Sequence, residues 1–308
     1  MYYPLVSVIV PNYNHARYLE QRLDTVFNQT YQNFEVIILD DKSTDNSLEV
    51  INKYKDNPHL AQIVVNEQNT GSPFKQWDKG INLAKGELVW IAESDDYNEL
   101  TFLEELITEW GKHEDVVVAF SQYVMCDENN KILTKSKKGK THCFNGVRYV
   151  RKRMARCCEV RNASGALFLK SQVSNISKRY LTYKNTGDYQ FWSEMIACGN
   201  VLRLRKNLTY WRQCTTSVTS TNISTGTTSK EDKSVFDFIK SHYSLNCVDE
   251  YIAYAQHIAC YNKLIYNNES IRYSILQIWS DNHKHIKKID SLLLWLIGSI
   301  ERHLGILI

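Results

Sequence analysis

Short apolar runs alternate with amphipathic stretches through residues 1–124. The runs are rich in Val, Ile and Leu and are about four to nine residues long, which is typical of buried strands. We predict strands at residues 5–10, 35–39, 62–65, 87–92 and 116–124. Between them, apolar side chains recur at helical spacing, and we predict helices that include residues 19–27, 48–54, 74–84 and 100–112. This alternation predicts an α/β domain with a mostly parallel sheet.

The pattern changes after Val124. Residues 127–130 have turn composition, which predicts a hairpin. Further along we predict helices at 146–156 and 188–198 and short strands at 166–169 and 200–204. Residues 215–229 are rich in Thr and Ser and hold almost no bulky apolar side chain, which predicts a loop or linker. From residue 230 onward the pattern is helical.

The composition is that of an ordinary globular protein, with 43% apolar and 23% charged residues in a chain of 308. The net charge of +3 is too small to indicate nucleic-acid binding. The eight cysteines show no metal-binding spacing, which favours reduced thiols. We expect no signal peptide, because the first residues pass directly into a strand, and no apolar run reaches the roughly 18 residues of a membrane span. We therefore expect a cytoplasmic protein.

The sequence Glu93-Ser94-Asp95-Asp96 directly follows the apolar run 87–92. Three carboxylates in four residues repel one another unless they are neutralised, and a divalent cation with oxygen ligands is the usual partner. A second acidic pair, Asp40-Asp41, ends the run 35–39. Because open parallel sheets bind ligands beyond the carboxyl ends of their strands, the two clusters predict one metal–nucleotide site. The alternative for either cluster alone is a solvated turn or a helix cap.

Five motifs follow one another along the chain: residues 4–14, residues 28–45, Asn69-Thr70-Gly71, Ala84-Lys85-Gly86-Glu87 and Glu93-Ser94-Asp95-Asp96. This series resembles glycosyltransferase family 2, strongly over residues 4–124 and more loosely over 125–215. The resemblance implies a GT-A type fold, which is an α/β, Rossmann-like, mostly parallel sheet flanked by helices, here with a helical C-terminal extension. It divides the chain into a catalytic domain at 1–215 (nucleotide-binding half 1–124, acceptor half 125–215), a flexible loop or linker at 216–229 and a helical region at 230–308.

The same resemblance implies a metal site in the acidic cluster. Asp96, and next to it Asp95, match the family's metal-binding acids. Glu93 departs from the family pattern, in which Asp is more usual, and would bind the metal through water or contact the ribose. The expected cofactor is Mn²⁺ or Mg²⁺, which suits carboxylate oxygens and would act as a Lewis acid on a diphosphate leaving group.

A donor site for a nucleotide sugar is also implied. The first loop of the family contacts the nucleoside, and Tyr13 lies in it, with packing in the turn as the alternative role for its ring. Asp41 matches the residue that hydrogen-bonds the base. The expected nucleotide-sugar-binding residues are Pro11, Tyr13, Asp40, Asp41, Asp95 and Arg212.

Inversion at the sugar requires one carboxylate to take the proton from the acceptor hydroxyl. Asp188, in Thr186-Gly187-Asp188, matches the family's catalytic base at the start of a helix. An Asp at that position is also a good helix cap, and spacing alone favours the cap. The resemblance favours catalysis.

The function that the resemblance implies is an inverting, metal-dependent glycosyltransferase of hexosyl or N-acetylhexosaminyl type. It would move a sugar from a nucleotide-diphosphate sugar, with a UDP-sugar as the first choice, to a hydroxyl of a glycan or a lipid-linked saccharide. Bacterial surface polysaccharide synthesis is the expected setting. The alternatives are a nucleotidyltransferase of related fold, which would need a glycine-rich loop after the first strand, and a non-catalytic sugar-nucleotide-binding protein.

Two further features bear on partners. Residues 131–156 hold ten Lys or Arg and no Asp or Glu, which suits a polyanionic acceptor or an acidic membrane surface unless the charges are balanced within the fold. The apolar segment around Trp295 would lie at a membrane interface, pack on the preceding helix or pair with a second subunit. Peripheral membrane contact and a homodimer through the C-terminal helices are therefore both hypotheses.

Overall fold

The computed structural model describes residues 2–136, 139–213, 222–261 and 269–280. The chain forms two compact units, each built from separate segments. The sheet unit comprises Met1–Cys143, Val160–Ile176 and Gly199–Cys214, and the helical unit comprises Phe144–Glu159, Ser177–Cys198 and Thr215–Ile308. The segments 144–159 and 177–198 thus belong with the C-terminal helices, whereas the extent of a catalytic domain over residues 1–215 stays a prediction.

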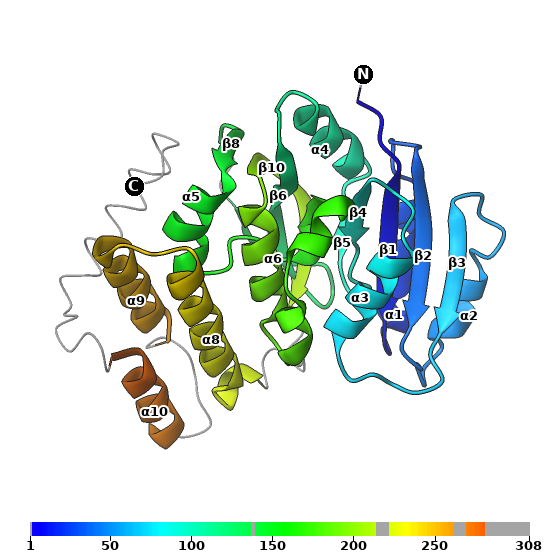
Figure 1. The fold of residues 1–308 in the computed structure, drawn as a ribbon. Coiled ribbons are helices and arrows are strands. Elements are labelled where there is room, and N and C mark those ends of the chain that lie inside the picture. The colour runs from blue at the N-terminus through cyan, green and yellow to red at the C-terminus, as the bar shows by residue number, and fades with distance from the viewer. Residues whose placement is uncertain (1, 137–138, 214–221, 262–268, 281–308) are drawn as a thin grey trace. The chain divides into compact units, whose positions relative to one another are not determined.

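The described residues contain a ten-stranded sheet in the order β3-β2-β1-β4-β9-β6-β10-β5, with β7 paired to β6 and β8 to β10 (Figure 1). Its strands are β1 Val6–Asn12, β2 Phe34–Asp40, β3 Leu60–Val65, β4 Leu88–Ile91, β5 Tyr97–Asn98, β6 Val116–Asp127, β7 Ile132–Lys135, β8 His142–Asn145, β9 Ala166–Leu169 and β10 Asn200–Gln213. β1 pairs in parallel with β2 and β4, as do β2 with β3 and β6 with β10, while β9 runs antiparallel between β4 and β6. The predicted α/β fold with a mostly parallel central sheet is confirmed.

The helices of the sheet unit are α1 Ala16–Phe27, α2 Ser47–Asn52, α3 Pro73–Leu83 and α4 Phe102–Trp110, and those of the helical unit are α5 Gly146–Lys152, α6 Gly187–Ala197, α8 Thr227–His242, α9 Cys247–Tyr261 and α10 Glu269–Ser280. Alternate side chains of β1 point to opposite faces of the sheet. Val6 and Val8 belong to a buried cluster that includes side chains of α1 and α4. Ile9 lies against Gly80 in α3. Helices therefore cover both faces of the sheet, as the alternating pattern predicts.

Three predicted boundaries differ from the structure. The strand predicted at 200–204 continues to Gln213, because the polar residues around Asn207 interrupt the apolar pattern where the pairing of β10 with β6 shifts register. The helix predicted from residue 230 begins at Thr227, inside the segment 216–229 predicted to be a loop. The helix predicted at 146–156 ends at Lys152 and is followed by a short 3₁₀ turn.

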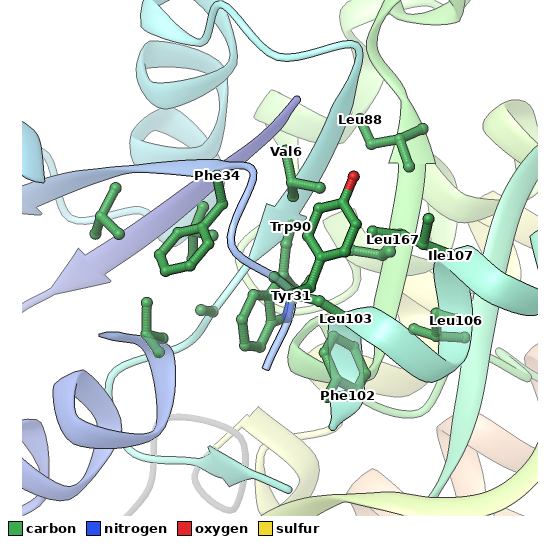
Figure 2. Close-up of a cluster of buried hydrophobic side chains, with 14 of the residues drawn as sticks. Val6, Tyr31, Phe34, Leu88, Trp90, Phe102, Leu103, Leu106, Ile107 and Leu167 are labelled. Atoms are coloured by element: carbon green, nitrogen blue, oxygen red, sulfur yellow. The ribbon is translucent and has the colours of Figure 1, made fainter. Parts of the chain in front are cut away.

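The core of the sheet unit is centred on Trp90 of β4. Figure 2 shows this indole among buried side chains that include Val6, Phe102 and Leu167. The rings of Trp90 and Phe102 lie 4.7 Å apart, and the Trp90 Nε1–H donates a hydrogen bond of 2.9 Å to the carbonyl oxygen of Ser164. A buried indole N–H needs such a partner. The core is therefore tied directly to the loop that precedes β9.

Of the helices in the described part of the chain, none combines the length with the apolar character that a membrane crossing requires. The segment around Trp295, predicted to contact a membrane or a second subunit, lies outside the described residues. Residues 214–221 of the predicted loop also lie outside them.

Gly86, in the turn before β4, provides a test of the fold. Its N–H donates a 2.7 Å hydrogen bond to Ser7 Oγ, and a Cβ added at Gly86 would lie 2.5 Å from the backbone nitrogen of Ser7 and 2.7 Å from the carbonyl oxygen of Leu5. Gly86→Ala must push two strands apart, and we expect it to lower the free energy of unfolding by about 1–3 kcal/mol or more. Urea unfolding measures this loss. Lys85→Ala, at the exposed neighbouring position, is the control and should stay within about 0.5 kcal/mol of wild type; equal effects of the two changes would contradict the close approach.

Candidate functional site

The parallel pairing of β1 with β2 sets Asn12 opposite Asp40 where both strands end. Asp40 is fully buried, and its carboxylate accepts hydrogen bonds of 2.8 Å from Asn12 Nδ2 and of 2.8 Å from the backbone N–H of Ser43. These bonds join the two strand ends and hold the turn that follows β2. Asp40, predicted to bind the nucleotide sugar, therefore directs its carboxylate at the protein itself.

Asp41 gathers the next two segments of the chain. Its carboxylate accepts hydrogen bonds from Asn66 Nδ2 at 2.6 Å, from Gln76 Nε2 at 2.9 Å, and from both the N–H and the hydroxyl of Thr70, the hydroxyl at 2.8 Å. A carboxylate offers about four lone-pair sites, so these donors hold it in one orientation. A hydrogen bond from a nucleotide base to Asp41 would have to displace one of these donors, and the Gln76 amide is a side-chain donor that also has Thr70 Oγ1 as a partner at 3.1 Å.

The loop after β1 presents Tyr13 to solvent. Asn14 adopts a left-handed backbone with φ of 55°, its N–H donates to Ser43 Oγ at 2.9 Å, and its side-chain oxygen accepts from the N–H of Thr44 at 2.7 Å. These bonds join the loops that follow β1 and β2. Pro11 is buried, whereas 44% of Tyr13 is exposed. The ring of Tyr13 is therefore accessible to a ligand, and its role as a nucleotide contact stays a prediction.

The acidic cluster at the end of β4 forms a tight turn. The N–H of Asp96 donates to the carbonyl oxygen of Glu93 at 3.2 Å, which leaves Ser94 and Asp95 as the two central residues. Ser94 is buried, and its hydroxyl lies 2.8 Å from Nδ1 of His15. Asp95 is half-buried, and its carboxylate accepts no hydrogen bond from any residue that the structure describes. The turn therefore holds three carboxylates close together but leaves one of them open.

Asp96 is used inside the protein. Only 2% of it is exposed, one oxygen accepts from the backbone N–H of Arg212 at 3.0 Å, and the other accepts from Asn162 Nδ2 at 2.7 Å and Ser164 Oγ at 2.8 Å. Burial, and next the charge of Asp95, raise the pKa of Asp96 to about 6. Protein donors thus engage both oxygens of Asp96 and make it part of the frame that holds the turn, and its role as a metal ligand stays a prediction.

Glu93 is held on its side-chain and backbone atoms. Oε1 accepts from the indole N–H of Trp77 at 2.7 Å, the backbone N–H donates to Ser164 Oγ at 3.0 Å, and the carbonyl oxygen accepts from Nε of Arg22 at 2.8 Å. Burial, and next the charge of Asp95, raise the pKa of Glu93 to about 8. The carboxyl group of Glu93 is thus fixed by a hydrogen bond to the protein, whereas that of Asp95 in the same turn has none from the described residues.

Two buried guanidinium groups lie against this turn. Arg22 binds the carbonyl oxygen of Glu93 and also Asn98 Oδ1, the latter at 2.7 Å. Burial lowers the pKa of Arg22 to about 10, and the negative charges of the acids in the turn oppose that shift. Arg212 donates to the carbonyl oxygen of Asp95 and, at 2.8 Å, to Gln21 Oε1, with its guanidinium 4.4 Å from the ring centre of Tyr18. The Nη atoms of Arg212 thus bind the protein, and the predicted contact of Arg212 with the nucleotide sugar stays a prediction. The two arginines therefore offset part of the repulsion among the three carboxylates, for which the sequence predicted a divalent cation alone.

The residues of the turn fit a divalent ion that is shared with a substrate. In the part of the chain that the structure describes, no group of three or more His, Cys, Asp or Glu is arranged to hold a metal. Ions that carry substrate phosphates often take only one or two carboxylates from the protein, and the other ligands are phosphate oxygens and water. The open carboxylate of Asp95 meets that requirement.

Asp188 lies in the helical unit, in the first turn of α6. Its Oδ1 accepts from the N–H of Tyr189 at 2.8 Å, and the side chain is half-buried. Burial raises the pKa of Asp188 to about 6, and the nearby charge of Glu231 adds to the shift. Asp188 thus binds a backbone N–H within the first turn of α6, whose N-cap is Thr186, and its other oxygen accepts no bond from the described residues. Its raised pKa suits a group that takes up a proton.

The basic stretch 131–156 finds partners inside the helical unit. Arg151 Nε donates to the carbonyl oxygen of Tyr243 at 2.5 Å, and Lys152 pairs with the buried Asp249 at 2.7 Å. These contacts balance part of the charge within the fold. An acidic membrane surface or a polyanionic acceptor as its partner stays a prediction.

Residues 7–175 match the sequence profile of glycosyl transferase family 2, which is more than half of the chain. The chain belongs to glycosyl transferase family 2. Among its relatives, glycosyltransferase GlyG of Streptococcus pneumoniae is 35% identical over 126 residues, which are 41% of this chain and 41% of GlyG. The poly(ribitol-phosphate) β-N-acetylglucosaminyltransferase TarS of Staphylococcus aureus is 35% identical over 115 residues, which are 36% of this chain and 20% of TarS. The chain thus spans less than half the length of these curated relatives.

Solved structures agree with the GT-A fold. TarS residues 1–349 in complex with UDP-GlcNAc superpose with a TM-score of 0.61 at 19% identity, over 96% of this chain and 81% of that one. The mannosyltransferase PcManGT of Pyrobaculum calidifontis, in complex with GDP-Man and Mn²⁺, gives a TM-score of 0.51 at 16% identity, over 98% of this chain and 81% of that one. At such identities the likeness is one of fold.

The family match includes the whole acidic turn but ends before Asp188. Within the matched segment, three residues that hold the turn were missed from the sequence, namely Arg22, Trp77 and Asn162. Arg22 did leave a signal, because it lies on the same helical face as Leu19, Leu23 and Val26, where a charged residue needs a buried partner. The hydroxyl of Ser164 also holds the turn, because it donates to Asp96 and accepts from the N–H of Glu93.

The two adjacent aspartates of the turn should differ in what they do for stability. Asp96→Ala leaves three buried donors without an acceptor and removes a charge that compensates Arg22, and we expect the free energy of unfolding to fall by about 3–5 kcal/mol. Asp95→Ala is the matched control and should change it by less than about 0.5 kcal/mol. Urea unfolding at pH 7.5, where the carboxyl of Asp96 is mostly ionised, measures both. Equal losses in the two variants would contradict this assignment.

Proposed function

We propose that this family 2 chain is an inverting glycosyltransferase that moves a sugar from a nucleotide-diphosphate sugar to a hydroxyl of a glycan or lipid-linked saccharide. The observation that carries the proposal is the open carboxylate of Asp95, held at the carboxyl end of β4 inside the segment that matches the family. A UDP-sugar of hexosyl or N-acetylhexosaminyl type is the proposed donor, in line with the UDP-GlcNAc complex of TarS. Bacterial surface polysaccharide is the proposed product, in line with TarS and its poly(ribitol-phosphate) acceptor.

In this proposal the nucleotide lies over the ends of β1 and β2. The exposed ring of Tyr13 stacks on the base, and Asp41 accepts a hydrogen bond from it in place of the Gln76 amide. Asp95 holds Mn²⁺ or Mg²⁺ through its open carboxylate, and the bound ion would offset the charge that develops on the departing diphosphate. Asp96, Arg22 and Arg212 keep the turn in place.

The proposed base is Asp188. As the acceptor oxygen forms its bond to the anomeric carbon, the bond from that carbon to the diphosphate oxygen breaks, and the hydroxyl proton passes to the Asp188 carboxylate. The raised pKa of about 6 keeps the carboxyl ionised at neutral pH while making it a stronger base than an ordinary Asp.

The donor and the metal can be tested together by thermal unfolding with UDP-, GDP- and dTDP-sugars, each with and without Mn²⁺. We expect a UDP-sugar to raise the Tm by several degrees with Mn²⁺ present, since a ligand at about 100 times its Kd adds about 2.7 kcal/mol. Asp95→Asn should abolish the Mn²⁺-dependent part of the shift. A shift with a GDP- or dTDP-sugar alone would refute the choice of UDP, and a full Mn²⁺ effect in Asp95→Asn would refute the metal ligand.

The base can be tested by Asp188→Asn. The variant should lower turnover by roughly 10²–10⁴-fold and leave the donor Kd unchanged, because only proton transfer is lost. Turnover is measured as UDP released with the best glycan from an acceptor panel. In the wild type the rate should fall as the pH drops below about 6, because protonated Asp188 cannot accept a proton. Wild-type turnover by Asp188→Asn, or a rate that persists well below pH 6, would exclude Asp188 as the base.

A further inference from the structure

One face of α8 carries a row of polar side chains that is directed at a single segment of the chain. Thr228, Glu231 and Ser234 follow one another at a spacing of three residues, which places them on the same side of a helix. The segment they contact is 183–186, which leads directly into α6 and Asp188. All of these residues belong to the helical unit.

The contacts are made in register. Tyr183 shares a hydrogen bond of 3.0 Å with Ser234 Oγ, and Asn185 Nδ2 donates to Thr228 Oγ1 at 2.8 Å. Between these two contacts lies Glu231, which binds mainly backbone N–H groups. The segment is therefore docked on α8 at both ends and in the middle.

The carboxylate of Glu231 accepts hydrogen bonds from three consecutive backbone N–H groups. They come from Lys184 at 2.8 Å, Asn185 at 2.9 Å and Thr186 at 3.0 Å, and the hydroxyl of Thr186 approaches at 3.4 Å. Hydrogen bonds to an ionised acceptor are roughly twice as strong as neutral ones. One side chain thus fixes the backbone of three residues in a row.

These three residues determine where α6 begins. Thr186 is the N-cap of α6, and its own side chain makes no capping hydrogen bond within the helix. A negative charge at a helix N-terminus is favourable, so Glu231 supplies from another helix what a capping side chain supplies locally. Asp188 follows two residues after the cap, and its position depends on the fixed backbone before it.

We propose that Glu231 is a positioning residue for Asp188: it holds the backbone of residues 184–186 so that the Asp188 carboxylate stays in place for the acceptor hydroxyl. The proposal rests on the function proposed above, in which Asp188 is the base. It gives a role in the reaction to α8, which lies beyond the segment matched by the family. Pre-organisation of this kind matters because a displacement of about 1 Å can cost a factor of about 100 in rate.

Glu231 also acts on the charge of Asp188. Burial has the largest effect on the pKa of Asp188 and raises it, whereas hydrogen bonds from the backbone N–H groups of Tyr189 and Asp188 lower it. Among the described residues, Glu231 is the charged side chain that raises this pKa further. Removal of the Glu231 charge should therefore lower that pKa and move the acid limb of the pH–rate profile to lower pH. A side chain that served only to hold α8 in the fold would change stability without this shift.

Three substitutions separate the effects. Glu231→Ala removes the acceptor, Glu231→Gln removes the charge and keeps one oxygen, and Glu231→Asp keeps the charge on a shorter side chain. Asp237→Asn is the matched control, because it removes one negative charge from the same helix at an exposed position where the carboxylate pairs with Lys233 and not with residues 184–186.

The first measurement needs no activity. Hydrogen–deuterium exchange of the amides of residues 184–186 should be roughly tenfold faster in Glu231→Ala, slightly faster in Glu231→Asp and unchanged in Asp237→Asn. Exchange in Glu231→Ala equal to that in Asp237→Asn would overturn the proposed backbone contact, whatever the function of the chain.

The second measurement is the rate as a function of pH. We expect kcat to fall about 10- to 100-fold in Glu231→Ala with the donor Kd unchanged, with partial rescue in Glu231→Asp. In Glu231→Gln the acid limb should move to lower pH. If Asp188→Asn is inactive but the Glu231 variants keep the wild-type kcat and acid limb, the positioning role is refuted and the base assignment stands. If Asp188→Asn is fully active, the base assignment itself is refuted, and the exchange experiment still decides the backbone contact.

Discussion

The sheet unit depends on the compensation of charge at the end of β4. Three carboxylates lie within one turn, and a buried charge without a partner costs several kcal/mol. Arg22 reaches the turn from α1, Arg212 reaches it from β10, and the hydroxyl of Ser164 joins them from the loop before β9. Three distant segments of the chain therefore meet at this turn. Their convergence explains why a turn so rich in acid can be buried at all.

The same arrangement gives the two adjacent aspartates different surroundings. The turn sends the Asp96 side chain inward, where protein donors occupy both of its oxygens, and leaves Asp95 at a central turn position with an open carboxylate. The hydrogen bonds to Asp96 also restrict the position of Asp95, because the two residues are joined by one peptide unit. A site that must hold a metal–diphosphate pair benefits from this rigidity, because a metal ligand works best on a fixed frame.

Sequence reasoning went furthest where structure is local. The apolar run 35–39 became β2, the run 166–169 became β9, and the acidic ends of β2 and β4 lie at one edge of the sheet because parallel strands place them there. It reveals less about contacts between distant residues. The three donors to Asp96 come from residues more than sixty positions away, which no local pattern reveals. Gln21 and Asn130, the side-chain partners of Arg212, likewise lie far from it in the sequence.

The discontinuous make-up of the sheet unit has a consequence for biosynthesis. The ribosome delivers β1 to β4 and the acidic turn early, but Arg212 follows only after residues 144–159 and 177–198, which belong to the other unit. Of the two arginines that contact the acidic turn, only Arg22 has been synthesised before β10 emerges. The central sheet therefore cannot close in order of synthesis, and its last strand must be inserted beside β6 after an excursion of the chain. Non-local closure of this kind slows folding, so the time for which this turn stays incomplete is determined by the length of the inserted segments.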